Sequence, residues 1–426
     1  MNSKAVKVIL VSLIFAILLF LPSLDSLGKK YSHLAFQEKK ASENVPAVEK
    51  TPAVPVNRKM TGTVFGYLPS WKYPEAVANI KFRLLTHLAI FDFAAGQDGS
   101  ITNPELWPWT DVIDSAHVNG VKVIMTVMNQ DSLQIHNILT DAKAKESSFQ
   151  NIKKIMKEFS LNGVNVDFEN PKRSDRNGAV MGYMHDLTRF IHAEFPGSEV
   201  SFAGPAVNWG GWNFKGLSEA CDYIFVMGYD YTDARSNISG PTASLNGSYY
   251  SIESTLLSTV FGYGEVTQSN PEKLILGVPY YGNHWVTETG NPQAFNLRYI
   301  ETPTFSSLMQ DAERFRYRKY WDKYNNVPWF RFQKNGEWHQ VWFEDARSIG
   351  MKYDYAMSKN LRGVGIWALG YDGSRQELWK EIEKRFLYSS FTSLAVMPLS
   401  LQESPFDYRA LLSRGLQQVL ELKKGA

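Results

Sequence analysis

Short runs of β-branched and aromatic residues alternate along this chain with longer segments whose apolar residues recur at helical spacing. This alternation is typical of repeated βα units, in which a helix covers each buried strand of a parallel sheet. Eight such strands close into a barrel of roughly 250 residues. The pattern therefore predicts an α/β protein with a (β/α)8, or TIM, barrel. Its strands are expected at Val64–Tyr67, Leu85–Phe91, Val121–Val127, Gly163–Phe168, Glu199–Ala203, Tyr223–Met227, Leu274–Val278 and Val364–Trp367.

The connections between these strands are mostly of ordinary length, with one exception. From Gly178 to Phe195 the apolar residues recur at helical spacing, which predicts an ordinary barrel helix. The connection between the seventh and eighth strands is too long for a plain loop and contains strand-like aromatic patches. We expect a small α+β insertion there, at about residues 283–350. Its place on the C-terminal face of the barrel would make it one wall of a cleft.

The two ends of the chain differ in composition from the barrel. The N-terminus carries lysines followed by an uncharged apolar run from Val8 to Leu24, which is the pattern of an export signal or a membrane anchor. The protein is therefore expected outside the cytoplasm, secreted or anchored to the membrane at the cell envelope. The expected division is a signal peptide or anchor over residues 1–28, a polar flexible tether over 29–62, the barrel over 63–386 and a partly helical tail over 387–426.

Charge and cysteine content exclude several classes of protein. The 426 residues carry 45 basic and 43 acidic side chains, so a net charge of +2 gives no reason to expect nucleic acid as a partner. The single cysteine, Cys221, excludes an internal disulfide. His87, His185 and His192 are isolated and lack the spacing of metal ligands. We expect a monomer without a metal or another cofactor.

The segment from Leu161 to Asn170 carries the strongest chemical signal. Strand side chains alternate between two faces, so Asn165, Asp167 and Glu169 share one face. Carboxylates within a buried strand are costly unless they are paired or have a task. They form either a structural ion pair or part of an active site at the mouth of the barrel.

This segment resembles the D-G-x-D-x-D-x-E signature on the fourth strand of glycoside hydrolase family 18. The resemblance extends from about Thr63 to Arg385, and it implies retaining, substrate-assisted hydrolysis of β-linked N-acetylglucosamine polymers without a protein nucleophile. Four further motifs occur in the family's order: FGYLPSW at residues 65–71, VMGYDY at 226–231, LGVPYYG at 276–282 and GIWALGYD at 365–372.

Each site residue takes a role in that chemistry. Glu169 would protonate the departing glycosidic oxygen and then activate water, and Asp167 would orient the 2-acetamido group of the substrate. By resemblance, Tyr229 would donate to the acetamido oxygen and Asp230 would bind nearby polar groups. These four residues are the predicted catalytic set. The predicted substrate-binding residues are Trp367, as the floor beneath the reacting sugar, together with Asn165, Tyr67, Trp71 and Tyr281.

Other aromatic residues follow the ends of predicted strands. Such residues stack on sugars, but they also pack in protein cores, and we expect about half of them to be simply packed. They are Trp107, Trp109, Trp209, Trp212 and Trp285, and the same expectation covers Tyr67, Trp71 and Tyr281.

Two positions depart from the family signature. Asn162 replaces its first aspartate and Asn165 its middle one, so the neighbour of Asp167 is an amide that we expect to hydrogen-bond it without sharing a proton. The G-V-N-V-D-F-E form resembles the branch of bacterial spore-cortex and peptidoglycan N-acetylglucosaminidases and is also similar to chitobiase. The apolar N-terminus favours a bacterial envelope enzyme acting on cell-wall peptidoglycan. The alternatives are a chitinase or chitobiase acting on chitin oligosaccharides, and a catalytically silent carbohydrate-binding barrel, against which Glu169 argues.

Overall fold

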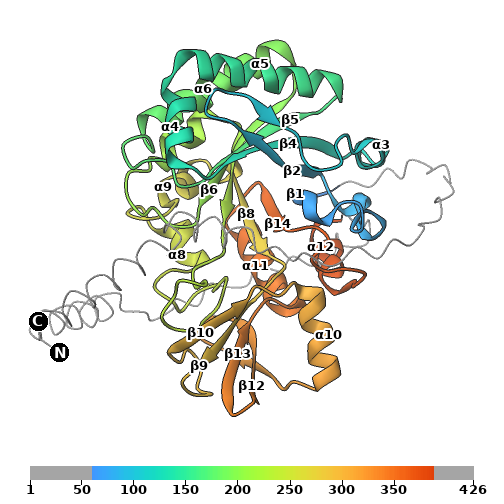
Figure 1. Ribbon diagram of the computed structural model, residues 1–426, viewed down its shortest axis with the longest axis vertical. Coiled ribbons are helices and arrows are strands. Elements are labelled where there is room, and N and C mark those ends of the chain that lie inside the picture. Colours follow the sequence, from blue (N-terminus) through green and yellow to red (C-terminus); the bar gives the residue numbers. More distant parts are fainter. Residues whose placement is uncertain (1–59, 388–426) are drawn as a thin grey trace, which may run out of the picture. The chain divides into compact units, whose positions relative to one another are not determined.

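A computed structural model describes residues 60–387 and contains the predicted barrel (Figure 1). Eight parallel strands follow the order β1-β14-β8-β7-β6-β5-β4-β2, and pairing of β1 with β2 closes the ring. All eight strands overlap the predicted runs, so the predicted fold is confirmed. The strands are β1 (Thr63–Pro69), β2 (His87–Ala95), β4 (Lys122–Asn129), β5 (Gly163–Phe168), β6 (Glu199–Pro205), β7 (Tyr223–Met227), β8 (Leu274–Pro279) and β14 (Gly363–Trp367).

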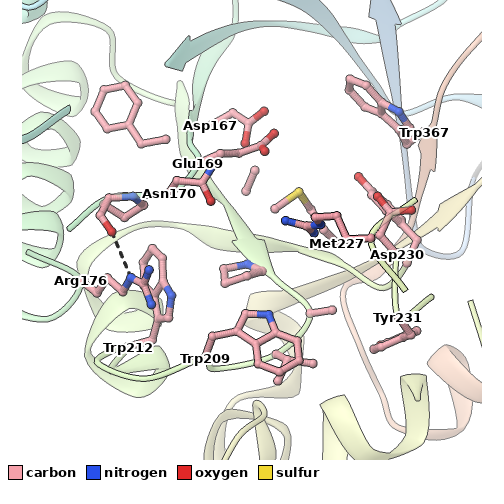
Figure 2. Close-up of a pocket in the computed structure, with 18 of the residues that line it drawn as sticks. Asp167, Glu169, Asn170, Arg176, Trp209, Trp212, Met227, Asp230, Tyr231 and Trp367 are labelled. Atoms are coloured by element: carbon pink, nitrogen blue, oxygen red, sulfur yellow. Dashed lines mark hydrogen bonds between the residues drawn. The ribbon is translucent and has the colours of Figure 1, made fainter. Parts of the chain in front are cut away.

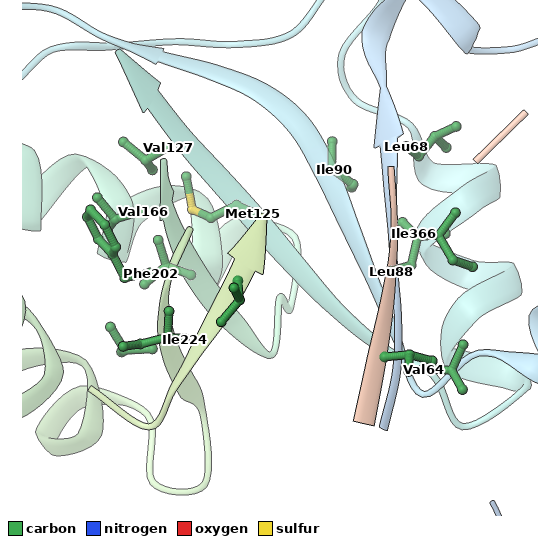
Figure 3. Close-up of a cluster of buried hydrophobic side chains, with 14 of the residues drawn as sticks. Val64, Leu68, Leu88, Ile90, Met125, Val127, Val166, Phe202, Ile224 and Ile366 are labelled. Carbon is green, nitrogen blue, oxygen red and sulfur yellow. The ribbon is translucent and has the colours of Figure 1, made fainter. Parts of the chain in front are cut away.

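The alternation of side chains along each strand divides the core into two layers. Outward-facing residues such as Val64, Val166 and Ile366 are fully buried beneath the surrounding helices (Figure 3). Inward-facing aromatic residues such as Phe65 and Phe225 fill the barrel, with their ring centroids 5.5 Å apart. The interior is therefore a packed core, and a ligand has access only at its mouth.

Helices cover the outside of the barrel after most strands. The predicted helix from Gly178 is confirmed as α6 (Gly178–Glu194). The connection after β1 holds only the short 3-10 turns η1 (Ser70–Lys72), η2 (Val77–Asn79) and η3 (Phe82–Leu84). The remaining elements around the barrel are β3 (Ile101–Thr102), α3 (Thr110–Val118), α4 (Ser132–Thr140), α5 (Ala142–Glu158), α7 (Phe214–Ala220), α8 (Ile252–Leu257), α9 (Gly264–Ser269), η4 (Pro271–Lys273), α11 (Ala346–Ser358) and α12 (Glu377–Phe386).

The predicted α+β insertion lies between β8 and β14. Its five antiparallel strands follow the order β10-β9-β13-β12-β11 and enclose the buried residues Trp285, Trp329 and Trp342. The expected end near residue 350 falls within α11, which packs on β8 and β14 and so belongs to the barrel. The insertion consists of β9 (Asn283–Thr287), β10 (Asn296–Glu301), α10 (Phe305–Phe315), β11 (Lys319–Asp322), β12 (Val327–Lys334) and β13 (Glu337–Trp342).

The predicted signal or anchor, nearly all of the tether and the C-terminal tail lie outside the described residues. At the boundaries of the described part, Met60 forms an antiparallel bridge with Leu387. Within residues 60–387, the helices are all too short or too polar to cross a membrane.

Candidate active site

Strand β5 brings the predicted carboxylates to the mouth of the barrel (Figure 2). Asp167 points inward and is only 5% exposed, while Glu169 follows the last residue of the strand and is half-buried. Both side chains line a cleft of about 370 Å³. The alternation inferred from the sequence therefore agrees with the observed geometry, in which Val166 and Phe168 pack on the opposite face.

Strand β7 supplies the facing side of the cleft. Tyr229 and Asp230 follow its last residue, and both line the cleft. Asp230 has a left-handed backbone (φ 59°), a conformation that aspartate tolerates better than most residues. Its Oδ1 atom accepts a hydrogen bond of 2.6 Å from the hydroxyl of Tyr281. Tyr281, which was predicted to bind substrate, is only 5% exposed and positions the carboxyl group of Asp230 through this hydrogen bond.

Trp367, the last residue of β14, lies at one side of the cleft (Figure 2). Its ring centroid is 5.4 Å from that of Tyr67 and 6.3 Å from that of Trp71, both in edge-on arrangements. Trp71 is 41% exposed and donates from Nε1 to the hydroxyl of Tyr371 at 3.2 Å. Trp367 and Tyr67 therefore present apolar surface to the cleft, and the role of Trp367 as the floor beneath a sugar stays a prediction.

The cleft continues away from Trp367 toward Trp209 and Trp212 (Figure 2). Trp209 is 64% exposed and packs its ring edge-on against Tyr250, with centroids 4.8 Å apart. Arg176 lies beside these residues and is fixed by bonds to backbone carbonyl oxygens. This part of the cleft therefore presents exposed aromatic surface, of the kind that can stack on a sugar.

Burial raises the pKa values of the carboxyl groups in the cleft. Burial, and next the charge of Glu169, hold the pKa of Asp167 well above its usual range. Burial also raises the pKa of Glu169, although a hydrogen bond from Gln130 and the charge of Arg235 act in the opposite direction. Together these two groups retain a proton more readily than isolated carboxylates would.

Asp230 also has a raised pKa, of about 6, because protein atoms surround it on most sides. The hydrogen bond from Tyr281 partly offsets this effect. The side chain is nevertheless open to solvent through the cleft. A polar group of a substrate would therefore have direct access to it.

Asn165 does not take the position expected of a substrate-binding residue. Its side chain is completely buried and lies below the cleft. It accepts a 2.8 Å hydrogen bond from the hydroxyl of Tyr67 and donates to Ser201 Oγ at 2.9 Å. The expected bond to Asp167 is replaced by these two, and Asp167 Oδ1 is buried without a partner. Asn165 thus supports the site from beneath.

The remaining tryptophans form two groups, one in the core and one that lines the cleft. Trp109 and Trp285 are fully buried, and Trp107 packs on Phe93 and Phe159, so these three are core residues. Trp209 and Trp212 line the cleft. His87 is buried and bonds Glu199, and within residues 60–387 His, Cys, Asp and Glu side chains form no group of three that could hold a metal.

Three residues near the carboxylates were missed from the sequence. Gln130 follows β4 and bonds Glu169, Arg176 follows β5, and Arg235 follows β7. All three lie beyond the ends of strands, where the loops of such barrels carry functional groups. That location was the available signal, since no periodic pattern marks a loop.

Comparisons with known proteins agree with this geometry. The family profile of the glycosyl hydrolases family 18 matches residues 63–372. The di-N-acetylchitobiase of Homo sapiens is 25% identical over 307 residues, which are 64% of this chain and 75% of that protein. The cortical fragment-lytic enzyme of Bacillus subtilis (strain 168) is 25% identical over 303 residues, covering 67% and 65% of the two chains.

Solved structures share the fold. The spore cortex-lytic enzyme SleL of Bacillus megaterium QM B1551 superposes with a TM-score of 0.63 at 22% identity, covering 78% of this chain and 76% of that one. Because the family profile spans almost the whole barrel and includes every strand of the site, this chain belongs to glycosyl hydrolase family 18 and is a glycoside hydrolase.

Proposed function

We propose that this enzyme hydrolyses β-linked N-acetylglucosamine polymers with retention of configuration, using the substrate's own 2-acetamido group as nucleophile. The observation that carries the proposal is Asp167 Oδ1, a buried carboxylate oxygen without a hydrogen-bond partner beside the half-buried Glu169. A buried acceptor left unpaired is costly and is expected to gain a donor from a ligand. The N–H of an acetamido group is such a donor.

The reaction then follows from the positions of the side chains. Glu169, whose pKa is raised by burial, gives its proton to the glycosidic oxygen as the bond from that oxygen to the anomeric carbon breaks. The acetamido oxygen forms the new bond to the anomeric carbon, while Asp167 orients the acetamido N–H and stabilises the oxazolinium charge. Water then attacks the anomeric carbon and gives a proton back to Glu169, while the bond from that carbon to the acetamido oxygen breaks and restores the acetamido group.

Tyr229 and Asp230 hold the acetamido group from the other strand in this scheme. Tyr229 donates its hydroxyl proton to the acetamido oxygen, and burial, which raises its pKa, keeps that hydroxyl protonated. Asp230, fixed by Tyr281, accepts from a substrate hydroxyl or amide. Trp367 and Tyr67 form the apolar floor under the reacting sugar.

A mechanism with a protein nucleophile fits the cleft less well. It needs two carboxyl groups about 5 Å apart on opposite sides of the scissile bond. Asp167 lies on β5 and Glu169 directly follows that strand, so the two are about 6 to 7 Å apart between Cα atoms from the rise of a strand and approach from the same wall. Asp372 is 2% exposed and lies outside the cleft lining.

For the polymer itself we favour cell-wall peptidoglycan, with action at the cell envelope. The Bacillus relative is a cortical fragment-lytic enzyme, and the human relative, a di-N-acetylchitobiase, supports the alternative of chitin oligosaccharides. A silent binding barrel is disfavoured because Glu169 is present in the cleft.

The test is to incubate the purified protein with peptidoglycan and with chitin oligosaccharides, and to identify the products by mass. A matched chitin oligosaccharide with free amines in place of the acetamido groups serves as the control. We expect cleavage of acetylated glycans only. Hydrolysis of the de-N-acetylated glycan at a similar rate would sink the substrate-assisted mechanism and point to Asp230 as nucleophile, and absence of any cleavage would favour the silent barrel.

A further inference from the structure

Arg235, in the loop after β7, is a cation in the cleft for which the fold has no evident use. It lines the cleft, and its side chain is 89% exposed. Its ion pair is with Asp233 on the same loop, through Nε at 2.9 Å and Nη2 at 2.5 Å. Because the arginine of this pair is so exposed, the pair contributes only about 0–1 kcal/mol to stability. Both hydrogens of its other terminal nitrogen, Nη1, remain available to a ligand.

The position of Arg235 connects it with the reaction. Its charge lowers the pKa values of both Glu169 and Asp230, so it lies within electrostatic reach of the proton donor. In the proposed mechanism Trp367 holds the reacting sugar, and the cleft extends from there toward Trp209 (Figure 2). Arg235 lines this same cleft, in which the leaving sugar has to lie beyond Trp367.

Arg235 is paired with Asp233, and it is not the only cation beside the carboxyl groups of the cleft. Burial raises the pKa values of Asp167, Glu169 and Asp230, so these groups bind a proton more readily than isolated carboxyl groups do. Arg176 adds a second cation on the cleft wall, where Nε and Nη1 donate to the carbonyl oxygens of Pro171 and Gly210 at 3.1 and 2.9 Å. An anionic group on the leaving sugar would thus meet cationic side chains beyond the carboxylates.

We infer that Arg235 binds a carboxylate carried by the leaving sugar, as found on the free 3-O-lactyl ether of N-acetylmuramic acid. The guanidinium fork matches the geometry of a carboxylate. Chitin has no such group, so this contact would select peptidoglycan over chitin. The inference rests on the proposed function and names the form of its substrate.

A consequence concerns the order of reactions on the cell wall. The lactyl carboxylate is a charged acid only when no stem peptide is attached to it through an amide bond. The substrate of this enzyme must therefore be supplied by an amide hydrolysis that removes the peptide from the glycan strand.

The test measures kcat/KM on two soluble glycans: a chitin oligosaccharide and an alternating N-acetylglucosamine–N-acetylmuramic acid oligosaccharide with free lactyl groups. A third glycan has each lactyl group capped as its methylamide. For the wild type we expect a preference for the free acid over the capped form, and Arg235→Gln should lower the ratio of acid to capped glycan about tenfold. Arg235→Lys should keep part of the preference because it keeps the charge.

Arg298→Gln is the matched control. Arg298 is an exposed arginine in an ion pair with Glu337 on the insertion, and it lies outside the cleft lining. The substitution Arg298→Gln removes one positive charge, as Arg235→Gln does, and should leave the ratio of acid to capped glycan unchanged. An equal rate of the wild type on free and capped glycans, or an equal ratio for Arg235→Gln and wild type, would overturn the inference alone. If the wild type cleaves none of the three glycans, the proposed function fails and the inference fails with it.

Discussion

Glu199 at the start of β6 and Asp167 near the end of β5 are carboxylates on neighbouring strands of one barrel, yet their surroundings differ. Glu199 accepts hydrogen bonds from His87, Lys122 and Arg362 at 2.6 to 3.0 Å. Burial alone would raise its pKa, but the bonds and charges of His87, and next those of Lys122, outweigh burial and lower the pKa to about 2. Asp167 has no cation in contact, and its pKa is raised.

The carboxylates at the two ends of the barrel are therefore expected to serve different roles. At the amino end, the charge of Glu199 is compensated within the protein, so it contributes to the stability of the fold. At the carboxyl end, Asp167 has a buried oxygen without a hydrogen-bond partner, which the substrate would satisfy in the proposed mechanism. A buried carboxylate without a compensating partner lowers the stability of the fold. Such a loss of stability is expected at sites where activity requires it. Substitutions at the two ends should therefore differ in kind as well as in size.

The largest effect is expected for Glu169→Gln, which keeps the shape of the side chain but cannot donate the proton. Turnover should fall by about 10²- to 10⁴-fold, because that is the usual contribution of general acid catalysis. Binding of an uncleaved oligosaccharide, measured by calorimetry, should remain close to that of the wild type. If Glu169→Gln retained turnover, another residue would have to be the acid. The carboxyl end of β5 would then lose its proposed catalytic role.

At the opposite end, Glu199→Gln should affect the fold and spare the chemistry. Loss of the bonds to His87, Lys122 and Arg362 should lower the free energy of unfolding by about 1–3 kcal/mol at pH 7, allowing for their partial exposure. The folded pKa of Glu199 lies below the usual 4.5, so its stabilisation is present above that value and is lost as pH falls toward about 2.

Urea unfolding at pH 7 and at pH 3 would measure this effect. The gap between wild type and Glu199→Gln should be smaller at pH 3. Glu383→Gln is a suitable control, since its ion pair with Arg83 is 42 to 44% exposed and should matter by less than about 1 kcal/mol. Equal losses of stability for the two variants would show that the bonds of Glu199 contribute no more than those of an exposed ion pair.

The sequence predicted the barrel and the positions of the carboxylates because both depend on local periodicity. Alternation along β5 alone placed Asp167 and Glu169 on one face, and motif resemblance brought in Tyr229 and Trp367. The partners of Asn165 could not be found in this way. They are Tyr67 on β1 and Ser201 on β6, which reach it only through closure and register of the barrel. Residues in loops, such as Arg235, also escaped because their placement depends on tertiary structure rather than on a repeating pattern.

The smallest and most discriminating effect is expected for Asp167→Asn, which should damage turnover and yet stabilise the fold. The folded pKa of Asp167 lies above the usual 3.8, so its burial costs nothing below that value and costs most when pH exceeds the folded pKa. Removing the charge should therefore raise the free energy of unfolding by roughly 1 kcal/mol at pH 8, with little difference at pH 4. Asp175→Asn provides the contrast, because Asp175 is also buried but accepts a 2.8 Å bond from His136, so its loss should destabilise the protein. Urea unfolding of the wild type and the two variants at both pH values tests whether one substitution stabilises the fold and the other destabilises it. A destabilised Asp167→Asn at pH 8 would mean that the protein already compensates this carboxylate, and the contrast between the two ends of the barrel would not hold.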